Sequence, residues 1–315
     1  MRVPPAVEKL PSDSATAMGN SAAGGVSGST ALRLGRVSNL PTVWTNVLAG
    51  LVLAGSAVTA PSAIVLLVSL SLFYVGGMFL NDAFDREFDE RNRPDRPIPA
   101  GDVTAATVFV GGFGFLAVGL ILLVWVGYAL PNGTGWRAPA AGAVLAAAIV
   151  LYDAWHKGNA LGPSLMGFCR FLVYITAGLA IATTLPERLL VAAIVCWCYL
   201  IGLTYFAKQE NMSRFGSLWP LLFLAVPFVY GIPLAASNAS ALVLYALLLG
   251  AVLLALGYLF QFGSLGVPRA IALLIAGISL LDGLFVAGEG QMMLAGAAVG
   301  AFVLTLVFQR YIAGT

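Results

Sequence analysis

Apolar residues form long unbroken runs along most of the chain, and short polar linkers separate these runs. Most runs reach the roughly 20 residues that a helix needs to cross about 30 Å of hydrocarbon. They are continuous rather than alternating, which favours membrane-spanning helices over the strands of a membrane barrel. We predict ten spans, at residues 41–58, 62–81, 103–129, 138–153, 165–184, 187–206, 217–236, 239–260, 268–286 and 290–309.

The composition agrees with this pattern. Hydrophobic residues make up 60% of the 315 residues and charged residues 10%, whereas a soluble domain carries about 25% charged residues. We therefore predict an all-α fold, a polytopic membrane helical bundle of nine to ten transmembrane helices in a lipid bilayer. The net charge of +2 gives no sign of a nucleic acid partner. His156 is the only histidine, which excludes histidine clusters and Ser-His-Asp catalysis.

The first 30 residues differ from the rest of the chain, because they are rich in Gly, Ala and Ser and contain no apolar core. We predict a flexible cytoplasmic tail at residues 1–30. A signal peptide is not expected, since no apolar region follows its charges. The transmembrane domain is predicted to cover residues 31–315.

The distribution of Lys and Arg predicts the orientation. With ten spans both termini lie on one side, and that side holds fourteen of the sixteen Lys and Arg residues, while Arg137 and Arg188 lie on the other. The positive-inside rule places the N-terminus and the polar loops in the cytoplasm and makes this a multi-pass protein of the inner cell membrane. A nine-span model moves only Arg310 across. The polar loops therefore share one face and could meet around one site.

Four polar residues lie where the second predicted span ends, in the pattern N-D-x-x-D-x-x-x-D: Asn81, Asp82, Asp85 and Asp89. On a continuous helix they share one stripe, since residues three and four apart are neighbours. Carboxylates this close repel one another, more strongly near low dielectric. Because Mg²⁺ commonly combines one or two carboxylates with substrate phosphates, the stripe predicts a Mg²⁺ site that receives a diphosphate. The alternative is a solvated helix end whose acids pair with nearby arginines.

The segment that follows, RNRPDRPIPAG, is basic and stiff. Its two Arg-Pro pairs end the helix, because a residue before proline avoids the α region. Arginine suits phosphate through its planar fork of donors. Beside the acids, this turn predicts diphosphate contacts; taken alone, it fits an ordinary cytoplasmic anchor loop equally well.

Polar residues also gather after the fourth predicted span: Tyr152, Asp153, His156, Lys157 and Asn159. Arg170 lies inside the apolar start of the fifth span, and a charge at membrane depth is expensive and commonly faces the protein interior. Lys157 and Arg170 are therefore candidate phosphate ligands. Snorkelling to the interface is the plainer alternative for Lys157, and His156 fits an interfacial polar residue better than a ligand or a base.

The loop after the sixth predicted span contains Tyr205, Lys208, Glu210 and Arg214, with Glu210 as its single acid. Tyrosines at helix ends are common in the aromatic belts of membrane proteins, so Tyr205 has a plain alternative to a site role. Asp282 lies near the external end of the ninth span, where it can reach the interface, and it is left without a role.

The acid pattern, followed by Arg-Pro and the turn RPIPAG, resembles the UbiA superfamily of intramembrane prenyltransferases. The order of the charged loops supports this resemblance over residues 33–260. The segment RVSNLPTVWTNVLAG is similar to the first helix of the family, which places an asparagine in the active cavity; here that residue is Asn46. The acid motif is quite specific, whereas the other motifs are weak when taken alone.

The resemblance implies a bundle with a central cavity that opens to the cytoplasm and to lipid. In it, Mg²⁺ and a prenyl diphosphate bind to two Asp-rich motifs, and the isoprenyl group passes to an aromatic or other lipophilic acceptor. The implied metal ligands are Asn81, Asp82, Asp85, Asp89 and Glu210, with Asp82 and Asp85 as the catalytic pair. Substrate contacts implied by the family or indicated by the loops are Asn46, Arg96, Tyr152, Asp153, Lys157, Arg170, Tyr205, Lys208 and Arg214.

Two loops depart from the family pattern. The family has D-x-x-x-D after the sixth span, where this chain has YFAKQENMSR with Glu210 alone. After the fourth span the family often has Y-P-x-x-K, whereas here Asp153 follows Tyr152 and the lysine, Lys157, stands one place later. Asp153 is a candidate to stand in as a ligand. A divergent subgroup, similar to UbiA-like proteins of bacterial secondary-metabolite gene clusters, fits these loops better than the ubiquinone-pathway enzymes do.

Three functions remain in view. The first is a Mg²⁺-dependent prenyltransferase. The alternative is a non-catalytic UbiA-like protein that binds or transports an isoprenoid or a secondary metabolite, which the incomplete second motif favours. The third is an ion-coupled transporter, since intramembrane acids serve proton relays, but here the acids cluster at one face and the sequence shows no inverted repeat.

Overall fold

The computed structural model describes residues 26–55, 61–208, 219–312 and 314, and within these ranges the only regular elements are helices. Nine of the described helices are long and apolar enough to cross a membrane. They coincide with the first nine predicted spans, so the all-helical membrane fold is confirmed. In chain order the elements are α1 (Gly28–Leu34), η1 (Val37–Asn39), α2 (Leu40–Ala54), α3 (Pro61–Phe84), α4 (Arg86–Asn92), α5 (Ala105–Ala129), α6 (Arg137–Trp155), α7 (Gly162–Leu179), α8 (Glu187–Lys208), α9 (Pro220–Ser237), α10 (Ala239–Phe262), η3 (Gly263–Gly266), α11 (Val267–Gly288) and α12 (Met292–Phe308).

Several helices differ in length from the predicted spans, and two of these differences bear on the fold. The tenth span is α12, with 17 residues, which covers about 25 Å at ~1.5 Å per residue and is shorter than the roughly 30 Å of hydrocarbon. The first span ends at Ala54, because Gly55 adopts a left-handed φ of 89° and its N–H bonds to the carbonyls of Leu51 and Val52. Glycine makes this helix stop without a steric penalty.

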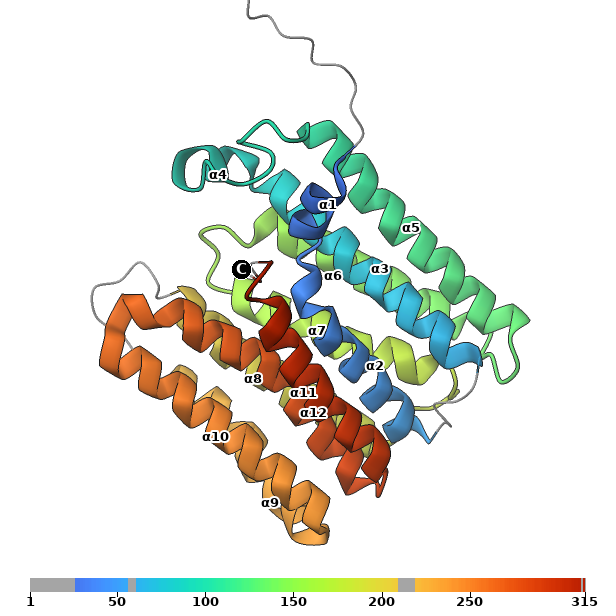
Figure 1. The fold of residues 1–315 in the computed structure, drawn as a ribbon. Coiled ribbons are helices and arrows are strands. Elements are labelled where there is room, and N and C mark those ends of the chain that lie inside the picture. Colours follow the sequence, from blue (N-terminus) through green and yellow to red (C-terminus); the bar gives the residue numbers. More distant parts are fainter. Residues whose placement is uncertain (1–25, 56–60, 209–218, 313, 315) are drawn as a thin grey trace, which may run out of the picture.

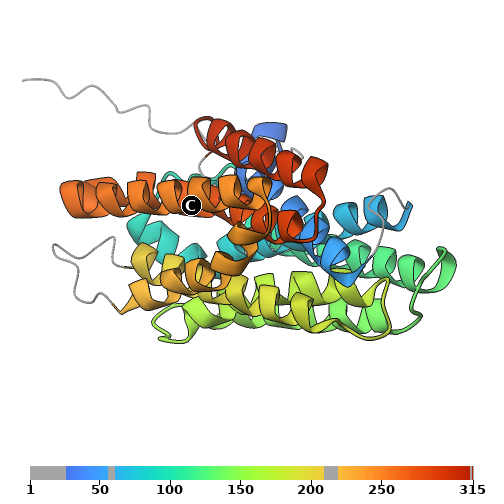
Figure 2. The same cartoon turned by 90° about the horizontal axis from the view of Figure 1, so that it is seen from below.

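The helices lie side by side in one bundle, as Figures 1 and 2 show from two directions. α11 is central, with 94% of its span buried against α2, α8, α10 and α12 among others. α5 and α9 lie at opposite edges, and only 28% of each span is buried. These outer helices expose apolar side chains such as Val110, Ile121 and Val229, which suits contact with lipid.

Two large hydrophobic cores form most of the interior, and a small third cluster contains Leu34, Phe79, Ala83 and Val108. The first core lies among α2, α3, α5, α6 and α7 and contains residues such as Val47, Phe73 and Leu145. The second joins α2 and α7 to the later helices α8 to α12, through residues such as Tyr199 and Phe285. α2 and α7 contribute to both cores, so they separate the earlier helices of the bundle from the later ones.

Glycines allow α3 and α5 to approach closely. A Cβ built on Gly76 would meet the carbonyl oxygen of Gly112 at 2.9 Å, and one built on Gly112 would meet Leu80 at 2.8 Å. Small residues at helix contacts are the usual way in which membrane helices gain van der Waals packing. This contact fixes the C-terminal half of α3, which leads into the acid motif.

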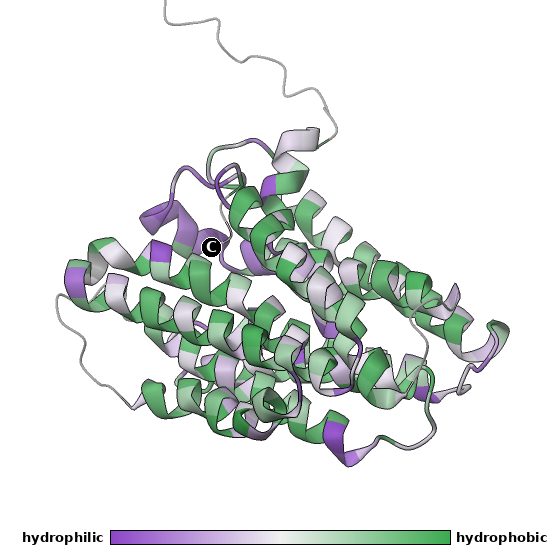
Figure 3. Ribbon diagram, turned by 60° about the horizontal axis from the view of Figure 1, so that its bottom comes forward, coloured by the Kyte–Doolittle hydropathy of each residue, from purple (hydrophilic) through white to green (hydrophobic). Residues whose placement is uncertain are grey.

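Polar residues gather at one end of the bundle, which we call the mouth end: residues 85–104, containing α4, and the turn at 156–161 between α6 and α7. Figure 3 shows a hydrophilic ribbon at α4 and the loop beside it, whereas most of the helices are hydrophobic. The chain also returns to this end at its C-terminus (Figure 1), where Asn39 Nδ2 donates to the carbonyl oxygen of Gly314 at 2.9 Å.

Candidate active site

A cavity of about 280 Å³ lies between the two cores and reaches the mouth end. Its apolar wall includes Phe73, Leu145, Val173 and Ile275, from four different helices. Its polar wall consists of Arg36, Asn39, Asn81, Asp85, Arg93, Arg96, Thr204, Tyr152, Asp153, His156, Lys157 and Arg170. The cavity therefore has an apolar part and a strongly charged part.

The acid motif bends over one end of this cavity. α3 ends at Phe84 and α4 begins at Arg86, yet the Asp85 amide donates to the Asn81 carbonyl and the Asp89 amide to the Asp85 carbonyl, both at 2.9 Å. The helical hydrogen-bond pattern thus continues through the turn. It keeps the four side chains of the motif together and buried, with exposed fractions of 6, 5, 5 and 1% for Asn81, Asp82, Asp85 and Asp89.

Two arginines neutralise Asp82. Arg36 Nη2 and Arg96 Nη1 each lie 2.9 Å from Asp82 Oδ1. Arg96 Nη1 also lies 3.1 Å from Asp89 Oδ2. Burial raises the pKa of the Asp89 carboxyl; Arg96 opposes this, and the nearby charges of Asp85 and Asp82 add to it.

Arg36 is a site residue that the sequence patterns did not single out. It has a left-handed backbone, with φ 41° and ψ 48°, which is uncommon for a residue other than glycine and costs conformational energy. The turn directs its guanidinium to Asp82 and to Asn81 Oδ1, the latter at 3.1 Å. The only sequence signal was a positive charge directly before the first span.

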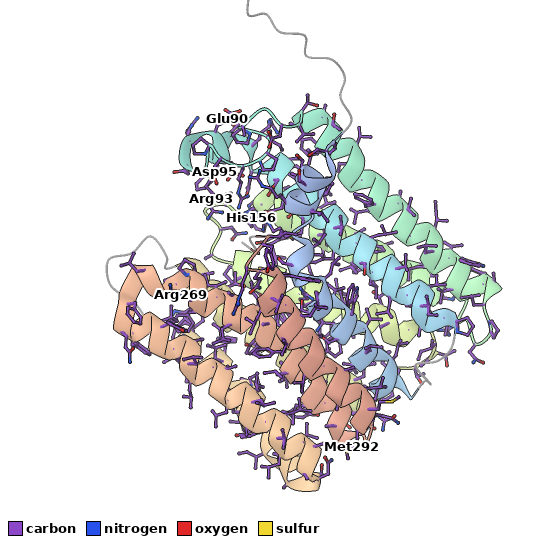
Figure 4. All side chains as sticks on the ribbon, in the orientation of Figure 1. Glu90, Arg93, Asp95, His156, Arg269 and Met292 are labelled. Atoms are coloured by element: carbon purple, nitrogen blue, oxygen red, sulfur yellow. The ribbon has the colours of Figure 1, made fainter. Side chains whose placement is uncertain are left out.

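Asp85 pairs with the turn between α6 and α7. Lys157 Nζ lies 2.9 Å and His156 Nε2 3.4 Å from Asp85 Oδ2. Burial opposes ionisation of Asp85, but the hydrogen bonds and charges of His156 and Lys157 outweigh it and hold the pKa of this carboxyl below its usual range. Lys157 Nζ also lies 3.9 Å from the Phe88 ring centroid, a cation–π contact. Figure 4 shows His156 beside the α4 region at the mouth end.

Asp153 brings α6 to the acid motif. Its Oδ1 accepts a hydrogen bond from Asn81 Nδ2 at 3.2 Å. The neighbouring Tyr152 stacks on His156 with ring centroids 4.7 Å apart. Two buried carboxylate oxygens, Asp153 Oδ2 and Asp89 Oδ1, have no hydrogen-bond partner within the described part of the chain.

The donor set fits a hard divalent cation. Asn81, Asp85 and Asp153 supply oxygen atoms at the cavity wall. Asp82 and Asp89 are buried in the same motif but are not part of that wall. Asp153 Oδ2 and Asp89 Oδ1 are buried acceptors without a donor among the described residues. Within the described ranges no three acidic, His or Cys side chains form a complete metal centre. Mg²⁺ needs no such centre, because one or two carboxylates together with substrate phosphates suffice.

A second polar network reaches the cavity through Arg170, where α2, α7 and α11 meet. Arg170 Nη1 donates to Asn46 Oδ1 at 2.7 Å, and Asn46 Nδ2 donates to Asp282 Oδ2 at 2.7 Å. Asp282 is 1% exposed, so it lies in the protein interior and not at the interface. The sequence left it unassigned, and its only signal was a charge within an apolar span.

The loop after α8 contributes less to the described site. Tyr205 donates through its hydroxyl to the Ala160 carbonyl at 2.6 Å and makes an edge-to-face contact with the Trp219 ring. It is absent from the cavity wall as the described residues define it. Lys208 ends α8. Glu210 and Arg214 lie outside the described residues.

Comparison with known proteins points to one family. The model of the UbiA prenyltransferase family matches residues 43–287. The digeranylgeranylglyceryl phosphate synthase of Methanoculleus marisnigri is 41% identical over 88 residues, which cover 26% of this chain and 31% of that protein. The protein of the same name from Methanopyrus kandleri is 27% identical over 274 residues, which cover 82% of this chain and 92% of that protein.

The fold is shared with a solved structure. A solved structure of a UbiA homologue from Aeropyrum pernix K1 superposes with a TM-score of 0.58 and 16% identity over 80% of this chain and 97% of that chain. At this identity the likeness shows the fold alone, whereas the family match extends over most of the sequence. The chain therefore belongs to the UbiA prenyltransferase family.

Proposed function

We propose that this protein is a Mg²⁺-dependent intramembrane prenyltransferase that moves an isoprenyl group from a prenyl diphosphate to a lipophilic acceptor. The observation that carries this proposal is one cavity with carboxylates and cations at its mouth end and an apolar wall behind them. The diphosphate belongs at the charged end and the isoprenoid chain along the apolar wall. Exclusion of water from that wall protects an allylic carbocation from hydrolysis.

The residues at the mouth end have separate tasks. Mg²⁺, when bound by Asn81, Asp82, Asp85 and Asp153 with the diphosphate oxygens, would neutralise the charge that develops on the leaving group. Arg36, Arg96 and Lys157 bind the phosphate oxygens. In the structure these cations pair with carboxylate oxygens, which take the place of the phosphate oxygens. Asp89, and Glu210 outside the described residues, remain predicted ligands.

The name of the relatives indicates the first substrates to test. Digeranylgeranylglyceryl phosphate carries two geranylgeranyl groups on one glyceryl phosphate. We therefore propose geranylgeranyl diphosphate as donor and geranylgeranylglyceryl phosphate as acceptor, within the broader class of aromatic and other lipophilic acceptors.

A turnover assay tests the proposal. Purified protein in detergent receives labelled geranylgeranyl diphosphate, Mg²⁺ and a panel of acceptors, and products are identified by mass spectrometry. We expect transfer that chelation with EDTA abolishes and that Asp85→Ala abolishes. Normal turnover by Asp85→Ala would refute the site assignment, and binding of the donor without transfer to any acceptor would support the carrier alternative.

The orientation can be tested separately. We propose that the mouth end faces the cytoplasm of a cell with this protein in its inner membrane, because fourteen of the sixteen Lys and Arg residues fall on that side of the predicted topology. Figure 4 shows Glu90 at the mouth end and Met292 at the other end. A membrane-impermeant thiol reagent added to intact cells should label Met292→Cys and spare Glu90→Cys; the reverse labelling would invert the topology.

A further inference from the structure

A buried aspartate on α11 has no part in the proposed function so far. Asp282 accepts hydrogen bonds from Thr45 Oγ1 at 2.5 Å, from Asn46 Nδ2 at 2.7 Å and from the hydroxyl of Tyr174. All three donors are neutral. A buried carboxylate is expensive unless an opposite charge compensates it, so the position of the nearest cation becomes important.

Asn46 connects Asp282 to that cation. It is 0% exposed, and both ends of its amide are used: the oxygen accepts from Arg170 Nη1 and the nitrogen donates to Asp282. Arginine can only donate and an ionised carboxylate can only accept, so this orientation of the amide is the one that satisfies both. The amide dipole thereby couples the two charges.

Arg170 is held on one side and free for a ligand on the other. Its Nη1 and Nη2 bond to Asn46 and to Thr42 Oγ1, at 2.7 and 3.0 Å, and its guanidinium lies 5.6 Å from the Tyr74 ring centroid. Arg170 also lines the cavity. A guanidinium carries five N–H donors, so donors remain for a molecule in the cavity.

Apart from the exposed Arg93, the arginines of the cavity wall and Lys157 are in two different settings. Arg36, Arg96 and Lys157 form ion pairs with the acid motif. Arg170 instead bonds to neutral oxygens of α2. A donor diphosphate at the acid motif would occupy the first group, so an acceptor that carries its own anionic group needs the second.

We propose that Asp282 is a positioning residue that acts through Asn46 to orient Arg170, and that Arg170 binds the anionic headgroup of the acceptor. This inference rests on the proposed function, because it assumes two substrates in the cavity. A planar guanidinium suits the oxygens of a phosphate monoester. Asp282 does not touch the headgroup; it fixes the cation that does.

Equilibrium binding tests this without turnover. The full-length protein in detergent is titrated by calorimetry with geranylgeranylglyceryl phosphate or, in a separate arm with Mg²⁺, with geranylgeranyl diphosphate. Asp282→Asn removes the carboxylate charge and replaces one of the two acceptor oxygens with an NH₂ group, so the network loses the charge that Asn46 couples to Arg170. We expect the affinity for the glyceryl phosphate to fall about tenfold or more, as for a lost hydrogen bond to a charged group, and the affinity for the diphosphate to change less than about threefold.

Two further probes separate positioning from general structural damage. Geranylgeranylglycerol lacks the phosphate, so its affinity should be the same for the wild type and for Asp282→Asn. If Asp282 acts only through Arg170, then Asp282→Asn should cause no additional loss of glyceryl phosphate affinity in a protein that already carries Arg170→Gln. The effects of the two substitutions would then be non-additive. Ser279→Ala is the matched control: it is equally buried on α11, and its hydroxyl lies 3.4 Å from Thr45 Oγ1 at the edge of the network.

The proposal is overturned by unchanged affinity of Asp282→Asn for the glyceryl phosphate, by an equal loss for both substrates, or by losses that multiply in the double variant. If Asp282→Asn does not fold, Asn46→Leu breaks the same bridge from α2 and should give the same loss. A wild type that fails to bind the glyceryl phosphate also overturns it. Binding with the expected losses but without transfer would refute the proposed function and leave the headgroup site standing.

Discussion

The guanidinium of Arg36 lies 2.9 Å from Asp82 Oδ1, so a residue that precedes the first membrane span closes over the acid motif at the end of the second. The same guanidinium reaches Asn81 Oδ1 at 3.1 Å. The left-handed backbone of Arg36 makes this approach possible. The N-terminal turn of the bundle is thus part of the candidate active site.

Arg36→Lys should impair the site although the charge is kept. Both bonds to Asn81 and Asp82 come from Arg36 Nη2, whose N–H groups are fixed in the plane of the guanidinium, whereas a lysine ammonium is a compact point charge on a flexible stem that does not reproduce this geometry. We expect kcat/KM for the prenyl diphosphate to fall about tenfold, the size of one charge-assisted hydrogen bond. Steady-state kinetics with varied diphosphate provide the measurement. Arg33→Lys is the control, since Arg33 is an exposed arginine 3.6 Å from Asp102; an equal loss in both variants would contradict a specific role.

Lys157→Met should make the reaction more sensitive to acid. In the wild type, the hydrogen bonds from His156 and Lys157 hold the pKa of Asp85 below its usual range in spite of burial. Burial raises the pKa of Asp85, and Lys157 counteracts this effect. Without Lys157 the pKa of Asp85 therefore rises, and the carboxylate protonates at a higher pH. The acidic limb of the pH profile of kcat/KM should therefore move to higher pH. Arg86→Gln changes an exposed arginine beside Glu87 and should leave the profile in place; an unmoved limb in Lys157→Met would contradict the ion pair.

Gly77→Val should shorten the isoprenoid that the cavity accepts. Gly77 lines the cavity, and a Cβ there would lie 3.0 Å from Ile149 Cγ2, so either the new methyl groups or Ile149 must move into the free space. We expect activity with geranylgeranyl diphosphate to fall more than activity with geranyl diphosphate, read as the ratio of the two kcat/KM values. Gly114→Val on α5 has open space around its Cβ, and its ratio should equal that of the wild type.

Gly76→Ala should weaken the contact between α3 and α5. The added Cβ would meet the Gly112 carbonyl oxygen at 2.9 Å, and backbone cannot move aside as a flexible side chain can. Overpacking of this kind costs about 1–3 kcal/mol, which thermal unfolding in detergent would detect. Gly250→Ala on α10 has nothing within 4 Å of its Cβ and should raise the midpoint slightly through helix propensity. A higher midpoint for Gly76→Ala would show that the two helices can separate at little cost.

The fold could be predicted from hydropathy because length and apolarity decide whether a helix crosses a membrane. All ten predicted runs correspond to described helices. The end of α2 was missed, since the left-handed Gly55 stops the helix inside an apolar run. Hydropathy shows which residues tolerate lipid, but it does not show where a residue with a left-handed backbone ends a helix within an apolar run.

The site was predictable where one short segment contains it. The spacing of Asn81, Asp82, Asp85 and Asp89 follows helical periodicity, and it could therefore be recognised from the sequence alone. Arg36 and Asp282 could not be recognised in this way, because their partners Asp82 and Asn46 are 46 and 236 residues away. Whether Asp282 reaches the interface or the interior depends on the helices around α11, and hydropathy does not give this arrangement.

The pairing of every acid in the first motif with a cation from its own chain has a further consequence. Substrate binding at Asp82 and Asp85 becomes an ion exchange: an arginine or lysine that turns to a phosphate oxygen frees a carboxylate, and that carboxylate then attracts a divalent cation. Neither the diphosphate nor the cation gains its full binding energy without the other, and each must raise the affinity of the site for its companion by the same factor. Such a site resists loading by either ion alone, which keeps the membrane cavity closed to abundant free cations and free phosphates until both parts of the substrate complex arrive.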